Sequence, residues 1–266
     1  MRIAVLADIH ANLPALEAVL AEPDVTSVDR VVLLGDIALG PMPAESLDLL
    51  SALGERAVWV HSNCEREIVA AYDAREHRAP AQSVAQHPAA GRHVEESEGP
   101  TMAKAEVSKP PAARASAAPL QPHHRDLLDG VPMTVTLDVD GLGPVLFCHA
   151  THRRDDEVVL VDSPMTRWVD VLHGVAEPTV VLGHTHMPFD RLVDRRRVVN
   201  PGSVGMAYGA SGACWALLGT LGSPVQLRRT AYDVNRAAAR IAASSYEGAD
   251  SWAQDYVLAP PRMPRH

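Results

Sequence analysis

Aromatic residues are scarce in this chain, making up only 4% of its 266 residues. The core must therefore be built mainly from valine, leucine, isoleucine and alanine. The apolar content of 47% supplies enough of these for one sizeable α/β domain. No apolar run approaches the roughly 20 residues that a helix needs to cross a bilayer, so we expect no association with a membrane.

Cysteine is also rare. Cys64, Cys148 and Cys214 are odd in number and widely spaced, which argues against a disulfide framework and a Cys-x-x-Cys zinc motif. The first apolar run ends at Asp8 and His10 and not at a small-residue cleavage site, so it does not resemble a signal peptide. These features predict a cytoplasmic protein.

Positively charged residues are fewer than negatively charged ones. The chain has 24 lysines and arginines against 33 aspartates and glutamates, which gives a net charge of −9. An acidic surface repels a phosphate backbone, so duplex nucleic acid is not an expected partner. A small phosphorylated substrate stays compatible if metal ions or local positive charge offset this field. The sequence carries no signal for the oligomeric state.

The apolar residues that are present fall into short, valine-rich runs that end in glycine, aspartate, asparagine or histidine. Such runs are typical of strands buried on both faces, and they occupy 3–8, 31–36, 57–63, 145–150 and 179–184. Helical spacing over 13–22 and 43–53 gives a strand–helix alternation. After residue 130 the chain is mostly short strands, with helices expected at 164–173 and 233–243. We therefore predict an α/β fold: a layered sandwich of two packed mixed β-sheets flanked by helices.

One domain is expected over residues 1–250, followed by a C-terminal tail at 251–266. Residues 73–119 contain no leucine, isoleucine, phenylalanine, tryptophan or tyrosine and are rich in alanine and proline. A segment that buries so little apolar area cannot offset the entropy lost on ordering. We interpret it as a flexible insertion or a lid.

Side chains able to bind a metal follow all five apolar runs. They are Asp8, His10, Asp36, Asn63, His149, His184 and His186. Alone, the His184-Thr185-His186 pair is compatible with two ordinary surface or core histidines. However, the carboxyl ends of strands in an α/β sheet converge. Gathering two aspartates and four histidines there without a metal would leave buried charge uncompensated.

Seven such ligands suit two ions that share one carboxylate. If Asp36 bridges them, each ion receives four protein contacts, at a separation of about 3.5–4 Å. Mixed nitrogen and oxygen ligands without thiolate favour Mn²⁺, with Fe, Zn, Co or Ni as alternatives. The chemistry that follows is hydrolysis by a hydroxide bridging the two ions.

Asp8-Ile9-His10, Gly35-Asp36, Asn63-Cys64, His149 and Gly183-His184-Thr185-His186, in this order, resemble the calcineurin-like metallophosphoesterases. The similarity is closest to the small bacterial phosphodiesterase branch with a Gly-Asn-Cys-Asp motif. It implies one metal held by Asp8, His10, Asp36 and His186, and a second held by Asp36, Asn63, His149 and His184.

The sequence departs from the family pattern in two places. His61 and Ser62 replace the usual Arg-Gly before Asn63, and Thr151-His152-Arg153-Arg154-Asp155 replaces a common Pro-Arg pair. His61 can be an added ligand or an ordinary strand histidine. Both departures affect the positioning of substrate more than metal binding.

The remaining candidates each have a functional and a structural interpretation. Cys64 occupies the position of a histidine proposed to protonate the leaving group in relatives, or packs as a buried thiol. Arg153 and Arg154, with His152, are candidates to hold a substrate phosphate, or form a solvated charged loop. Asn12 can contact substrate and assist catalysis, or only cap a helix. Asn200 can bind substrate or hold a metal ligand in place.

The function expected from these features is hydrolysis of a small soluble phosphodiester, which includes cyclic nucleotides. A phosphomonoesterase or a protein serine/threonine phosphatase with the same metal site is the alternative. A scaffold that has lost its chemistry is a third, but relatives of that kind typically lack ligand histidines that this chain retains.

Overall fold

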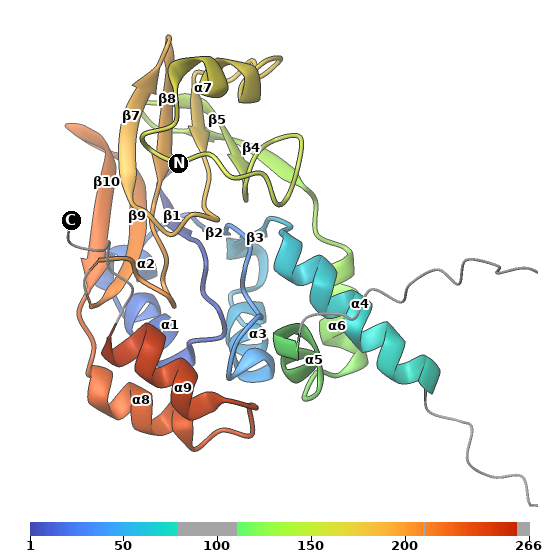
Figure 1. The fold of residues 1–266 in the computed structure, drawn as a ribbon. Helices are drawn as coiled ribbons and strands as arrows, with labels where there is room; N and C mark the ends of the chain where they lie inside the picture. Colours follow the sequence, from blue (N-terminus) through green and yellow to red (C-terminus); the bar gives the residue numbers. More distant parts are fainter. Residues whose placement is uncertain (79–110, 210, 260–266) are drawn as a thin grey trace, which may run out of the picture.

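The computed structural model describes residues 1–78, 111–209 and 211–259 and contains two five-stranded sheets (Figure 1). The first sheet has the order β10 (Ser223–Thr230), β9 (Ala213–Thr220), β1 (Ile3–Leu6), β2 (Arg30–Leu33) and β3 (Ala57–Trp59). The second has the order β4 (Thr134–Val139), β5 (Gly143–Cys148), β6 (Thr179–Val181), β8 (Arg196–Asn200) and β7 (Phe189–Val193). The predicted two-sheet α/β sandwich is confirmed.

Parallel pairing brings the functional ends of the strands together. In the first sheet β1, β2 and β3 run parallel, and in the second β5, β6 and β8 do. Each parallel set therefore ends at one edge of its sheet, where the loops that follow the strands meet.

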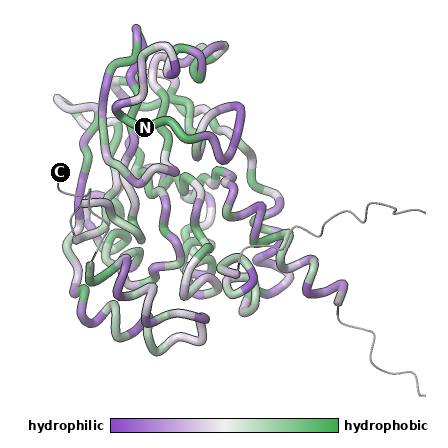
Figure 2. Tube along the Cα trace, viewed as in Figure 1, coloured by the Kyte–Doolittle hydropathy of each residue, from purple (hydrophilic) through white to green (hydrophobic). Residues whose placement is uncertain are grey.

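The alternation of side chains along β1 explains why its whole run is apolar. Ile3 and Val5 face the second sheet, and Ala4 and Leu6 face the helices on the other side. All four side chains are fully buried, and burying each large one contributes about 1.5–3 kcal/mol. Figure 2 shows the same apolar band along the central strands. The core between the sheets is aliphatic apart from Phe147.

Helices cover both outer faces of the sandwich. The first sheet is covered by α1 (Leu13–Leu20), α2 (Pro23–Thr26), α3 (Pro43–Ser51), α4 (Asn63–Arg78), α5 (Pro111–Ala117) and α6 (Pro122–Asp129), with the 3₁₀ turn η1 (Gly54–Arg56) before β3. The second sheet is covered by α7 (Met165–Val171), whose Trp168 is fully buried. The helices expected at 164–173 and 233–243 correspond to α7 and α8 (Val234–Ala242).

The segment predicted to be a flexible insertion, residues 73–119, is helical near both of its ends. Residues 73–78 continue α4, and residues 111–117 form α5, in which Ala113 and Ser116 are fully buried. Alanine is a strong helix former and packs closely, so a segment without large apolar residues can still dock. The part of the predicted insertion at 79–110 lies outside the described residues.

The predicted tail also begins later than expected. Residues 251–258 belong to α9 (Ala249–Ala253) and the π-helical turn η2 (Gln254–Leu258). Trp252, Ala253 and Val257 are buried in a cluster with Ile241 of α8. The apolar side chains of this segment fasten it to the domain. Residues 260–266 lie outside the described part of the chain.

Within the ranges that the structure describes, no helix combines the length and the apolar character needed to cross a membrane.

Candidate metal centre

The seven predicted ligands all lie at the ends of strands. Asp8 and His10 follow β1, Asp36 follows β2, and Asn63 opens α4 just after β3. From the second sheet, His149 follows β5, and His184 and His186 follow β6. The site is thus built by both sheets.

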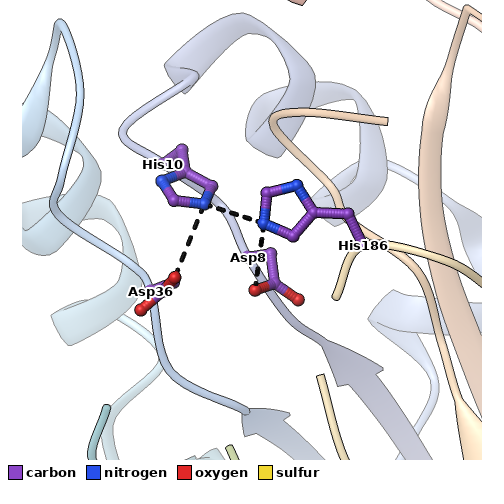
Figure 3. A group of neighbouring side chains, drawn as sticks. All are labelled: Asp8, His10, Asp36 and His186. Carbon is purple, nitrogen blue, oxygen red and sulfur yellow. Dashed lines mark hydrogen bonds and ion pairs between the residues drawn. The ribbon is translucent and has the colours of Figure 1, made fainter. Parts of the chain in front are cut away.

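One group consists of Asp8, His10, Asp36 and His186 (Figure 3). The Nε2 atoms of His10 and His186 lie 3.1 Å apart. Nε2 of His10 is 3.6 Å from Asp36 Oδ2, and Nε2 of His186 is 3.4 Å from Asp8 Oδ1. These ligand atoms all lie within 4.8 Å of one another, the size of a single metal-binding cluster.

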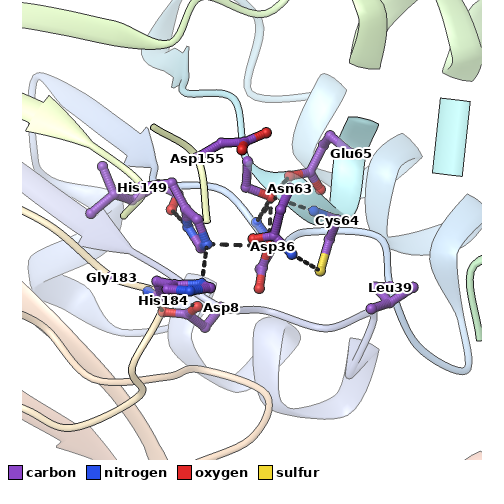
Figure 4. A network of polar contacts seen from close by, with 12 residues as sticks. Asp8, Asp36, Leu39, Asn63, Cys64, Glu65, His149, Asp155, Gly183 and His184 are labelled. Atoms are coloured by element: carbon purple, nitrogen blue, oxygen red, sulfur yellow. Dashed lines mark hydrogen bonds and ion pairs between the residues drawn. The ribbon is translucent and has the colours of Figure 1, made fainter. Parts of the chain in front are cut away.

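The second group consists of Asp36, His149 and His184. His149 Nε2 lies 3.3 Å from Asp36 Oδ1 and 3.2 Å from His184 Nδ1. Asn63 belongs to the same network of polar contacts (Figure 4). Asp36 is common to both groups and presents one carboxylate oxygen to each, which is the arrangement that a bridging ligand requires.

Two of the histidines are held in the tautomer that a metal needs. His10 Nδ1 donates to the carbonyl of Leu39 at 3.0 Å, and His149 Nδ1 donates to the carbonyl of Leu34 at 2.8 Å. Because a carbonyl only accepts, the proton of the neutral ring sits on Nδ1 and the Nε2 lone pair faces the cluster. Such backbone partners are typical of metal-binding histidines. The donor set therefore fits divalent metal ions.

The backbone is strained where the ligands are. Asp8, His10, Asp36, His184 and His186 all have φ between 49° and 65°. Aspartate and histidine tolerate this left-handed region better than most residues, yet each such residue costs about 1–3 kcal/mol. Sharp turns at five ligand positions indicate that the surrounding structure holds the side chains in a set arrangement.

Glycine precedes two of these ligands because no side chain would fit. A Cβ atom on Gly35 would lie 2.6 Å from His149 Nδ1, and one on Gly183 would lie 2.8 Å from Asp8 Oδ2. The Gly-Asp and Gly-His pairs seen in the sequence thus reflect close approach between the two sheets.

Ser62 and Glu65 form a support that the sequence did not reveal. Both accept from the Asp36 backbone N–H at 3.0 Å, and Glu65 also accepts from Ile37 N at 2.8 Å. Ser62 Oγ contacts the Glu65 carboxylate and donates to Asp36 Oδ1 at 2.5 Å. In the sequence, the only sign of a role for Glu65 was that it follows Asn63-Cys64, where the Gly-Asn-Cys-Asp motif has an acidic residue. Its partners are backbone groups, which no sequence pattern shows.

Burial and charge act against each other in the cluster. Burial alone would raise the pKa of Asp36, but His149 and His10 lower it below its ordinary value. Burial lowers the pKa of His10 and of His184. For His149, burial is outweighed by the carboxylates of Asp36 and Asp8, and the pKa is raised. Asp36 is thus held ionised and attracts cations into a buried site.

Cys64 is buried, with 3% of its surface exposed. Burial, and after it the nearby charge of Asp36, raises the pKa of the thiol well above its ordinary value. The side chain therefore stays a neutral thiol and is a weaker acid than an exposed cysteine. This environment favours the packing interpretation over that of a proton donor.

Asn12 and Asn200 each had a structural interpretation beside that of substrate contact, and both side chains are fully buried. Asn12 accepts from Ala15 N as the cap of α1 and donates to the carbonyl of Gly205 at 2.8 Å. Asn200 donates to the carbonyl of Gly183 at 2.7 Å, and so supports the turn before His184. Both side chains thus hold backbone segments next to the ligands from the buried side of the site.

The candidate phosphate-binding arginines are engaged with carboxylates. Arg153 pairs with Glu157 and Asp170, each at 2.8 Å, and Arg154 pairs with Asp156 at 2.9 Å. These contacts match the charged-loop interpretation.

His152 is partly buried, and its Nδ1 has no hydrogen-bond partner among the described residues. His152 belongs to neither of the two ligand groups.

A third set of potential ligands joins Asp48 of α3 to His123 and His124 at the start of α6. His124 Nδ1 accepts from the backbone N–H of Gln121, so its Nε2 carries the proton and donates to Asp48 at 2.9 Å. A metal at Nε2 would force two N–H groups to face each other. This set is a helix cap, not a metal site.

Comparison with known proteins gives one family and several similar folds. A family model described as the calcineurin-like phosphoesterase superfamily domain matches residues 1–222. A search of curated proteins finds no match.

Two solved structures match nearly the whole chain. A metallophosphoesterase from Sphaerobacter thermophilus is 23% identical over 97% of this chain and 98% of its own, with a TM-score of 0.69. A hypothetical protein from Pyrococcus horikoshii is 17% identical over 97% of this chain and 99% of its own, with a TM-score of 0.72. At these identities the similarity shows the fold.

Proposed function

The chain belongs to the calcineurin-like phosphoesterase superfamily and is a metal-dependent phosphoric ester hydrolase, and on this premise we propose that it cleaves a small soluble phosphodiester at a two-metal centre. The observation that carries the proposal is the sharing of Asp36 between two ligand groups, with one oxygen facing each. A single-metal site would not need the second set of histidines.

When bound, two divalent cations lower the pKa of a water molecule and neutralise charge on a phosphoryl group. The residues of the chain supply the rest. Asp8, His10, Asp36 and His186 would hold one ion, and Asp36, Asn63, His149 and His184 the other. Mn²⁺ is the ion that we propose, because the ligands mix imidazole nitrogen with carboxylate and amide oxygen.

The geometry also supports a substrate of limited size. The ligands are buried or half-buried, so only a small reacting group can approach them. The acidic net charge makes a long polyanion a poor fit, whereas a single phosphodiester gains locally from the two cations. Cyclic nucleotides are within this class.

The test is hydrolysis of an aryl phosphodiester and of the matching monoester by metal-stripped protein reloaded with Mn²⁺. We expect turnover that depends on the metal and favours the diester. Asp36→Asn should lower it by more than about 100-fold, since loss of a shared ligand exceeds the 10–100-fold effect of an outer partner. His173→Ala, an exposed histidine outside both groups, is the matched control.

The other outcomes are equally specific. Faster turnover of the monoester would overturn the proposed substrate class in favour of a phosphomonoesterase. Two bound ions with no turnover of either ester would favour a scaffold.

A further inference from the structure

Asp155 occupies an unusual place beside the candidate metal centre. Its carboxylate accepts from Arg66 Nε at 2.8 Å and from Arg66 Nη2 at 3.2 Å, and it lies 3.4 Å from His61 Nε2. Only 13% of its side chain is exposed, although Arg66 is half exposed. Partly buried, two-pronged pairs of this kind hold geometry more firmly than ordinary surface pairs.

The main chain of Asp155 reaches a predicted ligand. The amide of Asn63 satisfies both of its ends when Nδ2 donates to the carbonyl of Asp155 at 3.1 Å and Oδ1 accepts from Cys64 N at 3.2 Å. In this orientation Oδ1 keeps its second lone pair for another partner. A metal binds an amide through oxygen and not through nitrogen, so the orientation decides whether Asn63 can act as a ligand.

The loop that carries Asp155 is fixed at its other end as well. Glu157, with 8% of its side chain exposed, accepts from Arg153 and Arg167 and from Thr151 Oγ1 at 2.8 Å. This end of the loop is tied to α7, whereas Asp155 ties it to α4. The carbonyl that Asn63 contacts is therefore held from two sides.

The contact joins the two stretches in which the sequence departs from the family pattern. His61 comes from the first stretch and Asp155 from the second. A carboxylate on the loop needs a cationic partner on the facing element, and Arg66 provides it, with His61 Nε2 beside it. Figure 4 shows Asp155 and Asn63 in the network that contains Asp36 and His149.

We propose that Asp155 is a positioning residue, whose side-chain contacts with His61 and Arg66 hold its carbonyl where it orients Asn63 toward the second metal ion. This inference rests on the proposed two-metal centre. It assigns a metal-positioning role to the loop whose arginines were candidates for binding substrate.

The experiment is Mn²⁺ titration of metal-stripped protein by calorimetry, with kcat and KM measured on the same samples. We expect Asp155→Asn and Arg66→Ala each to weaken one of the two binding events by about 10–100-fold and to leave the other unchanged, as for other outer partners of metal ligands. kcat should fall more than KM rises. The double variant should bind no more weakly than either single variant, because both changes break one contact.

Asp156→Ala is the matched control. The Asp156 carboxylate is next to Asp155 in the chain, but it pairs with Arg154 and is 43% exposed. It should bind both ions as the unmodified protein does. Arg66 is half exposed at the start of α4, so Arg66→Ala keeps the test decisive if Asp155→Asn does not fold.

The outcomes separate the inference from the proposed function. Two binding events in the unmodified protein, with both unchanged or equally weakened in Arg66→Ala, would overturn the inference alone. Fewer than two events in the unmodified protein would overturn the proposed two-metal centre and the role of Asp155 with it.

Discussion

His10 and His186 are 176 residues apart in the chain, yet their Nε2 atoms lie 3.1 Å from each other, beside two aspartates. Without a cation, the two Nε2 atoms can share one proton in a hydrogen bond. If both are unprotonated, their lone pairs repel each other, which costs free energy. A metal ion between them satisfies both nitrogens and the carboxylates together.

Metal should therefore stabilise the fold. We expect Mn²⁺ at 100 times its dissociation constant to add about 2.7 kcal/mol to the free energy of unfolding, and a chelator to reverse this. Thermal unfolding with and without Mn²⁺ measures the effect. The gain should shrink in His186→Ala and persist in His173→Ala; an equal gain in both variants would contradict the assigned ligands.

Ser62→Ala should destabilise the protein by about 1–3 kcal/mol, because the buried Asp36 and Glu65 lose a hydroxyl partner while the Cβ packing is kept. Denaturant unfolding gives this value. Ser27→Ala, which removes an exposed hydroxyl, is the control and should change stability by less than about 0.5 kcal/mol. Equal effects in the two variants would argue against the support role of Ser62.

Gly205→Ala should cost about 3 kcal/mol or more, because the added Cβ would lie 1.8 Å from the carbonyl oxygen of Ile9. Ile9 stands between Asp8 and His10, so the obstacle is backbone that carries two ligands. Binding of Mn²⁺ should weaken as well. Gly130→Ala is the control, since its nearest contact is 3.4 Å and its φ is −84°.

Glu157 should make stability depend on pH in acid. Hydrogen bonds from Arg153, which outweigh the opposing effect of burial, lower the pKa of Glu157 from 4.5 to about 2. A carboxyl with a lowered pKa contributes stability above its unfolded value, and this is lost as pH falls from 4.5 toward 2.

The corresponding variant is Glu157→Gln. The difference in free energy of unfolding between it and the unmodified protein should be larger at pH 5 than at pH 3. Denaturant unfolding at the two pH values is the measurement. A difference that does not change with pH would show that the carboxylate is not held ionised.

The sequence was sufficient for the fold and for the ligand groups because both depend on local patterns. A valine-rich run that ends in aspartate or histidine places the polar residue at a strand end, whatever the rest of the chain does. Parallel pairing then brings Asp8 and Asp36 together at one edge of the first sheet, and packing of the two sheets brings His149 to them. The strand ends thus indicated which side chains would gather at one site, and the resemblance to the calcineurin-like family supplied their division into two groups.

Residues whose role depends on distant partners were not predictable in the same way. For Asn12 and Asn200 the sequence left substrate contact and a structural role open, and only the structure shows that the loop at 200–206 buries both. For Arg153 the sequence left phosphate binding and a charged loop open, and its partner Asp170 lies 17 residues further along, on α7. The helix at 111–117 was not predicted, because its alanines pack without the large apolar residues at helical spacing that mark a helix in a sequence.

The division of the ligands between the sheets has a consequence for how the molecule comes apart. Asp8 and Asp36 belong to the first sheet, and His149 and His184 to the second, so an ion that binds them joins the two layers. Neither layer alone carries a complete set, so a chain in which only one layer has folded would lack part of each ligand group. A bound ion would link the two sheets, so the sheets could separate only after the ion is released or its bonds to one sheet are broken. The barrier to unfolding, and with it resistance to slow degradation, then rises with the occupancy of the site.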